Sequence, residues 1–213
     1  MLNLAQRKPK FPVEEERLPW LSMLLDALWV IDRGVAASLP KHVAENPGQA
    51  VACHKGCHAC CLDNDIPVTP LEAVGITWFV AEKAARVVKA DVLTALQAFP
   101  HRANTEAGCP FVLNGNCLVY PVRPIACRNY IVFSVPCALG EDPTETRPGD
   151  VLRPIGSFAR QAFRLMLPYY GFHQEQDLEQ AVRDKYLFTV TGSMHRADWS
   201  RLKALVEASV RGS

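Results

Sequence analysis

Apolar residues recur every three or four positions near the start of the chain, which is the spacing of one helix face. The residues with this spacing are Leu18, Leu21, Leu25, Leu28 and Trp29. Pro40 and the Asn-Pro-Gly sequence at 46–48 are expected to break the chain after this segment. The pattern predicts a helix over 12–38 whose apolar face packs against another part of the protein.

A second helical region begins with a recognisable cap. Thr69 can cap a helix, Pro70 suits its first turn, and Glu72 completes a capping box with Thr69. We expect this helix to cover about 70–89. A shorter helix over 91–98, capped by its first residue, should follow.

The signal for β-structure is concentrated in residues 109–120. β-favouring residues there flank Asn114-Gly115, which is a strong signal for a tight turn. The segment predicts a β-hairpin.

The register of this hairpin determines where its two cysteines point. A two-residue loop pairs Val112 with Cys117 and would send Cys109 and Cys117 to opposite faces. A three-residue loop with Gly115 as a bulge pairs Phe111 with Cys117 instead. We expect the bulged register, because it lets both thiols face one ion.

The last third of the chain again has helical spacing. Residues 140–148 form a polar segment rich in proline, threonine and acidic residues, expected to be a mobile loop. Helices are predicted beyond it, over 154–167, 174–186 and 198–211. The fold class expected is mainly α with a small β-hairpin, as one domain over 1–213. Its metal-binding core would cover 53–137, between the helix at 12–38 and the helices within 154–211.

Composition places the chain among ordinary globular proteins. It has 213 residues, of which 49% are hydrophobic and 21% charged, with a formal net charge of +1. Disorder is therefore not expected, and the absence of a long basic run argues against nucleic acid as a partner. No run of eighteen apolar residues occurs, so we expect no membrane partner and a cytoplasmic location.

The cysteine content changes this picture most. The cysteines are Cys53, Cys57, Cys60, Cys61, Cys109, Cys117, Cys127 and Cys137. Cytosolic reductants disfavour disulfides, which indicates metal binding, although a secreted form with a leader absent from this sequence would allow disulfides. Four thiolates hold one zinc ion or anchor an iron–sulfur cluster. The surplus favours a cluster, a second ion or a reactive thiol.

Residues 53–61, CHKGCHACC, form the densest part of this set. Cys57-x-x-Cys60 is a two-ligand spacing, whereas the neighbours Cys60 and Cys61 would point to opposite sides of an extended segment. The cysteines at the centre of the expected ligand set are Cys57, Cys60 or Cys61, Cys109, Cys117 and Cys127. Cys53 is the next candidate. Cys137 fits a small buried apolar residue equally well. His54 and His58 fit positions outside the ligand set better than positions within it.

Two arginines flank one of the candidate ligands. Residues 123–128, RPIACR, predict a short helix beginning at Pro124, with Cys127 near its positive end, a placement that favours thiolate. Arg123 and Arg128 could offset the charge of a thiolate-rich site or bind an anionic group, as cofactor-binding residues. Surface ion pairing is the alternative for both.

The motifs together resemble a known family, the YkgJ-type cysteine-cluster proteins with a zinc- or iron-chelating CxxCxxCC domain. The resemblance rests on KGCHACC at 55–61, IPVTPLEA at 66–73, CPFVLNGNCLVY at 109–120 and RPIACRNY at 123–130. The first gap here is three residues, between Cys53 and Cys57. The metal ligands that the resemblance implies are Cys53, Cys57, Cys60, Cys61, Cys109, Cys117 and Cys127. The flagellin lysine N-methylases, which carry a 4Fe–4S cluster, resemble the same domain, so methyl transfer is one activity that the resemblance allows.

Three functions fit these residues. The first is an iron–sulfur protein, redox-active or methyl-transferring; the second is a structural zinc module that organises loops for a protein partner; the third is a metal carrier. Motifs of hydrolases, nucleotide triphosphatases and dehydrogenases are absent from the sequence. Catalytic residues and the choice between enzyme and binding protein are left open.

Overall fold

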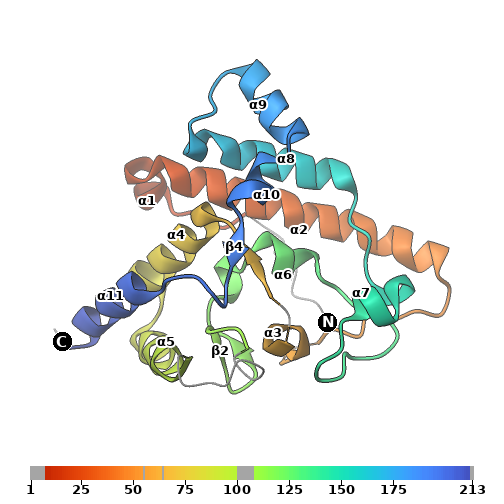
Figure 1. Ribbon diagram of the computed structural model, residues 1–213, viewed down its shortest axis with the longest axis horizontal. Helices are drawn as coiled ribbons and strands as arrows, with labels where there is room; N and C mark the ends of the chain where they lie inside the picture. Colours follow the sequence, from red (N-terminus) through yellow and green to blue (C-terminus); the bar gives the residue numbers. More distant parts are fainter. Residues whose placement is uncertain (1–7, 55, 64, 100–107, 212–213) are drawn as a thin grey trace.

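The longest element of the computed structural model is α2 (Pro19–Glu45), which runs from the middle-left of the view to its right edge (Figure 1). The structure describes residues 8–54, 56–63, 65–99 and 108–211. Leu21, Leu25 and Leu28 on α2 are at most 3% exposed. The predicted apolar face of this segment is therefore buried, as expected.

The bounds of the first helical segment differ from the prediction of 12–38. A short helix, α1 (Pro12–Arg17), ends at Leu18, and Pro19 begins α2. Proline suits a first helical position because no partner is needed there for a backbone N–H. The predicted break at Pro40 is wrong, because α2 continues through this proline to Glu45.

One C-terminal helix packs along α2, and the next helices pack on that helix and on one another. The helix α8 (Gly156–Met166) packs along α2 and is followed by η5 (Leu167–Tyr170), α9 (Glu175–Arg183) and α10 (Tyr186–Val190). Met166 and Leu167 are buried together with Leu24 and Leu28 of α2. Helices are present in both predicted ranges, 154–167 and 174–186. The second range is interrupted at Asp184–Lys185, between α9 and α10.

The capping box at Thr69 is present as predicted and begins α4 (Pro70–Trp78). The helix does not extend to residue 89, because it passes into a π-helical turn, η1 (Phe79–Lys83), and stops at Ala84. The next helix, α5 (Arg86–Ala98), begins five residues before the predicted cap at residue 91. That cap was wrong, because the backbone turns at Ala84 and Ala85 instead.

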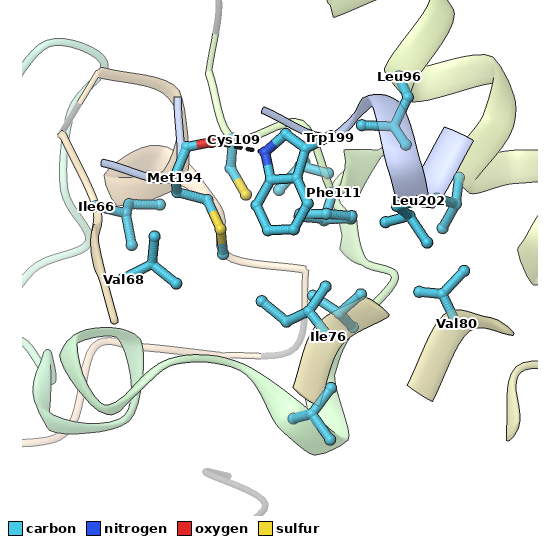
Figure 2. Packing of buried hydrophobic residues seen from close by; sticks show 14 of the residues in the cluster. Ile66, Val68, Ile76, Val80, Leu96, Cys109, Phe111, Met194, Trp199 and Leu202 are labelled. Carbon is cyan, nitrogen blue, oxygen red and sulfur yellow. Dashed lines mark hydrogen bonds between the residues drawn. The ribbon is translucent and has the colours of Figure 1, made fainter. Parts of the chain in front are cut away.

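The C-terminal segment completes the core beneath the hairpin (Figure 2). Trp199 stacks edge-on against Phe111 with ring centroids 4.8 Å apart, and its indole N–H donates to the Met194 carbonyl at 3.0 Å. Strand β1 (Pro67–Val68) pairs antiparallel with β4 (Gly192–Ser193). Together with α11 (Ser200–Arg211), which packs on α5, this segment closes one side of the cysteine-rich region.

The hairpin is present, but its expected register is wrong. Strand β2 (Val112–Leu113) pairs with β3 (Asn116–Cys117), with Val112 opposite Cys117. Asn114 and Gly115 have positive φ angles of 49° and 73°, so both central positions suit a two-residue turn of type I′. The bulged alternative with Phe111 opposite Cys117 is not adopted.

Short elements connect the remaining loops. They are α3 (Ala59–Asp63), η3 (Tyr120–Val122), α6 (Ile125–Asn129), α7 (Pro143–Thr146) and η4 (Pro148–Asp150). The region 140–148 thus contains helical turns where a mobile loop was expected. Arg147 stabilises these turns through ion pairs with Glu141 and Asp150. The fold is mainly α, in one domain, with two small antiparallel pairs of strands in the described residues.

Within the described ranges, no helix is both long and apolar enough to cross a bilayer.

A buried ion pair connects α2 to α6. Arg128 Nη1 donates to Asp32 Oδ2 at 2.6 Å, and both side chains are about as buried as core residues, at 7% and 6% exposed. Arg128 also donates to the carbonyls of Pro121 and Arg123. The guanidinium group therefore holds the turn before α6 against the long helix.

We predict that Asp32→Ala lowers the free energy of unfolding by about 3–5 kcal/mol, because it leaves the Arg128 charge buried without a partner. Urea unfolding monitored by circular dichroism measures the effect. Asp26→Ala is the control, since Asp26 forms an exposed pair with Lys8 worth about 0–1 kcal/mol. Equal destabilisation by both variants would contradict a structural role for the buried pair.

Candidate metal centre

Cys53 lies on an extended segment that runs beside residues 131–134. Ala52 N donates to the Val132 carbonyl at 2.8 Å, and Val132 N donates to Cys53 Sγ at 3.3 Å. Phe133 N in turn donates to the Asp150 carbonyl. Cys53 therefore presents a sulfur that already accepts a backbone hydrogen bond, as metal-bound thiolates commonly do.

Cys57 lies in a turn just before α3, and Cys60 and Cys61 lie within α3. Cys57 N donates to the His54 carbonyl at 3.0 Å, and Cys61 N donates to the His58 carbonyl at 2.8 Å. Cys60 and Cys61 are neighbours within α3, and the nearby Cys61 thiol raises the pKa of Cys60. The expectation that they lie on an extended segment with opposite orientations is wrong, because the segment is helical.

Cys109 is fixed directly against α3. Its backbone N–H donates to the Cys61 carbonyl at 2.5 Å. Gly108 makes this approach possible, because it has a φ of +51° and a Cβ there would lie 3.4 Å from the same carbonyl oxygen. The turn before the hairpin is thereby joined to the first cysteine group.

The hairpin brings Cys109 and Cys117 together despite the two-residue loop. Cys109 precedes the strand and lies in a turn closed by Val112 N donating to the Cys109 carbonyl at 3.2 Å. The alternation of faces along a strand does not apply to it, so the two sulfurs interact electrostatically. The backbone N–H groups of Phe111 and Val119, each two residues further along the chain, lower the pKa of Cys109 and Cys117 respectively.

Cys127 is positioned by α6, and α6 is positioned by a buried carboxylate. Glu72 Oε1 accepts from Ile125 N at 2.7 Å, while Glu72 Oε2 accepts from both Thr69 N and Thr69 Oγ1 at 2.8 Å. Burial raises the pKa of Glu72, and its hydrogen bonds oppose that shift. The capping box at Thr69, visible in the sequence, thus also orients the helix that carries Cys127.

Cys60 lies at the centre of the thiol group. The pKa shifts of the cysteines show electrostatic interactions of Cys60 with thiols from every other cysteine-bearing segment. These partners are Cys53, Cys61, Cys109, Cys117, Cys127 and Cys137. Cys57 belongs to the same group, because it interacts with Cys53 and Cys137. Electrostatic interactions therefore link all eight thiols, and Cys61, Cys109, Cys117 and Cys127 also share one hydrophobic cluster.

Cys137 is more exposed to solvent than the sequence-based alternative of a buried apolar residue implies. Its neighbours Val135 and Leu139 are 56% and 76% exposed, and Cys137 itself is half-buried. Its strongest electrostatic partners among the thiols are Cys60, Cys53 and Cys57. It therefore lies beside the cysteine group, at its exposed side.

Burial keeps these thiols protonated at neutral pH. It raises the pKa of Cys127 to about 12 and that of Cys137 to about 11, and it also raises the pKa of Cys53, Cys109 and Cys117. The placement of Cys127 in the first turn of α6 is as predicted, but this short helix does not by itself lower the pKa of the thiol. A bound cation is needed to convert these thiols to thiolates.

The two flanking arginines have different environments. Arg128 uses its guanidinium group for Asp32 and two backbone carbonyls. Arg123 lowers the pKa of Cys53, Cys60, Cys117 and Cys127, so its positive charge lies near thiols from four segments. Among the described residues, Arg128 is paired with a carboxylate, whereas Arg123 Nε is buried without a hydrogen-bond partner.

The two histidines of the cysteine loop contact backbone atoms of their own loop. His54 Nδ1 lies 3.1 Å from the Ala52 carbonyl, and His58 Nδ1 lies 2.8 Å from the Gly56 carbonyl. His58 also packs near Gly115 at the tip of the hairpin. These contacts favour the interpretation that both lie outside the ligand set.

The gathered side chains do not form a closed coordination shell as they stand. Among the described residues, no three His, Cys, Asp or Glu side chains are close enough together to hold an ion. The donor set nevertheless fits a thiophilic metal, because it combines clustered sulfurs, backbone N–H groups directed at several of them, and a nearby guanidinium group.

Comparison with known families identifies the cysteine-rich segment. Residues 52–145 match the CxxCxxCC family, described as a "putative zinc- or iron-chelating domain". The chain therefore carries a domain of this family, and metal binding is the property that the family description assigns to it. Comparisons with curated proteins and with solved structures gave no match.

We predict that Glu72→Ala lowers the free energy of unfolding by about 2–4 kcal/mol, because it leaves the buried N–H groups of Thr69 and Ile125 without acceptors. Thermal unfolding followed by circular dichroism measures this loss. Glu45→Ala, at an exposed helix end, should change stability by less than about 0.5 kcal/mol. A variant at position 72 as stable as the Glu45 variant would show that this carboxylate does not anchor α6.

Metal binding should release protons, because burial keeps the thiols protonated. Titration of Zn²⁺ into reduced, metal-free protein at pH 7.5 is expected to release about one proton per cysteine ligand. Calorimetry in two buffers with different ionisation enthalpies measures the number. The affinity should rise with pH, since each ligand loses a proton on binding. Zinc binding without proton release would show that thiols are not the ligands.

Proposed function

We propose that the gathered thiols hold an iron–sulfur cluster of the 4Fe–4S type. The ligands in this proposal are Cys57, Cys60, Cys109, Cys117 and Cys127 as candidates for the cluster itself, with Cys53 and Cys61 beside them. Four of this set suffice for one such cluster. When bound, a cluster of this type supplies one-electron chemistry.

The observation that carries the proposal is that thiols from separate segments meet: Cys61, Cys109, Cys117 and Cys127 share one cluster, and the others interact electrostatically with Cys60 or its neighbours. A single structural zinc ion requires four ligands, and the remaining thiols would then be buried without a role. Buried cysteines do occur as small apolar residues, but here they gather about one another from five segments. A 4Fe–4S cluster also takes four thiolates, but it is larger than one ion, and no three of the described His, Cys, Asp or Glu side chains are close enough together to hold a single ion.

The hydrogen bonds to sulfur support the same proposal. Val132 N donates to Cys53 Sγ, and the backbone N–H groups of Phe111 and Val119 lower the pKa of Cys109 and Cys117, which favours their thiolate forms. Hydrogen bonds of this kind stabilise metal-bound thiolates and set the reduction potential of clusters. The protein therefore contributes orientation and charge stabilisation through its own backbone.

Electron transfer is the activity that rests on the thiol set alone. Methyl transfer rests only on the resemblance to flagellin lysine N-methylases, and we assign no catalytic residue for it. The proposal requires a reducing compartment, in keeping with the expected cytoplasmic location, because oxidation of the thiols to disulfides would remove the ligands. A protein partner or substrate remains part of the proposal, since an electron carrier needs one.

A structural zinc site is the second candidate, and one observation favours it. Cys109, Cys117, Cys127 and Cys61 are part of, or pack against, the hydrophobic core that also contains Phe111 and Trp199. A zinc ion bound there would join α3, the hairpin and α6 as a staple.

Elemental analysis distinguishes the two candidates. Protein purified without oxygen is expected to be brown and to contain iron and acid-labile sulfide in equal amounts. Colourless protein with tightly bound zinc and no sulfide would overturn the iron–sulfur proposal and support the structural zinc site.

Substitution of a ligand tests the assignment of individual cysteines. Cys57→Ser should lose most of its iron and sulfide and unfold at a lower temperature, because metal binding contributes to folding free energy. His54→Ala is the matched control from the same loop, and it should keep its metal, since His54 is exposed and contacts only its own loop. Full metal content in Cys57→Ser would remove Cys57 from the ligand set.

A further inference from the structure

We propose that Arg123 is a positioning residue whose side-chain Nε–H donates a hydrogen bond to a sulfur atom of the metal centre. Its guanidinium group would be the internal positive charge that balances the thiolates. This inference rests on the proposed function, and it separates the roles of the two arginines that flank Cys127.

The backbone of Arg123 is held in place from both sides. Its N–H donates to the Tyr120 carbonyl at 3.4 Å, and its own carbonyl accepts from Arg128 Nε at 3.0 Å. Because Arg128 is fixed by Asp32 on α2, the position of Arg123 relative to α6 is fixed as well. The side chain thus starts from a rigid point next to the first turn of α6.

The guanidinium group is also oriented by an aromatic ring. Its central carbon lies 4.2 Å from the centroid of the Tyr120 ring, which is a cation–π contact. Arginine is suited to this arrangement, since its planar group can stack on a ring and donate hydrogen bonds from its edge. The ring therefore covers one side of a guanidinium group whose Nε is buried.

Nε of Arg123 is buried and has no hydrogen-bond partner among the described residues. A charged donor left unsatisfied in the interior costs more than a neutral one, so such atoms usually face a ligand, an ion or a water molecule. Thiolate sulfurs accept hydrogen bonds from charged donors more strongly than thiol sulfurs do, so metal binding would turn a thiol near Arg123 into the acceptor that Nε lacks. A sulfur of the centre therefore supplies the missing acceptor.

The electrostatic surroundings support this orientation. Arg123 lowers the pKa of thiols on four separate segments, which places its charge among them. Arg128 is different, because Asp32 lies 2.6 Å from it and neutralises its charge. The centre therefore has one nearby positive charge in this part of the described chain that is not paired with a carboxylate.

A positive charge and a hydrogen bond to sulfur both stabilise the reduced form of a cluster, which carries one more negative charge. Removing them should disfavour reduction. Because hydrogen bonds to charged groups are stronger than neutral ones, we expect about a tenfold lower ratio of reduced to oxidised cluster at a fixed potential. For a one-electron couple, this is a midpoint potential more negative by about 59 mV.

The experiment compares the wild-type protein with Arg123→Gln, Arg123→Lys and Arg160→Gln. Arg160 is exposed on α8 and serves as the matched control. Iron and acid-labile sulfide are measured first, and potentiometric titration followed by electron paramagnetic resonance then gives the midpoint potential. Arg123→Gln should retain a cluster with a more negative potential, and Arg123→Lys should fall between it and the wild type.

A second measurement keeps the inference testable if the wild-type protein holds zinc without sulfide, an outcome that would overturn the iron–sulfur proposal alone. Zinc-loaded proteins are then titrated with a chelator, and Arg123→Gln should release zinc about tenfold more readily than Arg160→Gln. Circular dichroism spectra that match the wild type establish that the variants are folded. An unchanged potential, or unchanged zinc release, in Arg123→Gln would overturn the role of Arg123.

Discussion

The structure depends on bringing eight thiol groups into one region of a mainly helical fold. Thiols gathered in this way are protonated, as the raised pKa values of Cys127 and Cys137 show, and close packing of thiolates without a cation would be unfavourable. A metal centre resolves this constraint, because it exchanges protons for coordination bonds. Folding of the cysteine-rich segment and metal binding are therefore expected to be coupled.

The rest of the molecule supports the segments that carry the cysteines. Glu72 connects the start of α4 to the start of α6, and the Asp32–Arg128 pair connects α6 to α2. On the other side, Trp199 and Met194 close the core beneath the hairpin (Figure 2). The C-terminal segment therefore lies outside the matched family segment, residues 52–145, but is part of the same core.

Local signals in the sequence predicted much of this arrangement. The capping box at Thr69, the turn at Asn114-Gly115 and the apolar face of α2 all depend on residues close together in the chain, and all are present. The predicted hairpin register was wrong because it assumed that Cys109 lies on the strand. In the structure, Cys109 lies in a turn before the strand. Likewise, the expected break at Pro40 did not occur, since tertiary packing keeps α2 continuous.

Contacts between residues far apart in the chain could not be predicted from such local signals. The pairing of β1 with β4 joins two-residue strands more than 100 positions apart, and Asp32 and Arg128 are separated by 96 positions. Arg123 and Arg128 look equivalent in the sequence, and only their partners in the fold distinguish a structural arginine from one that faces the thiols.

X-ray absorption at the edge of the bound metal tests the central claim most directly. The account predicts a first shell made of sulfur alone, at the metal–sulfur distance of about 2.3 Å that thiolate coordination gives. A first shell dominated by nitrogen or oxygen would contradict it, because the gathered cysteines would then not be the ligands.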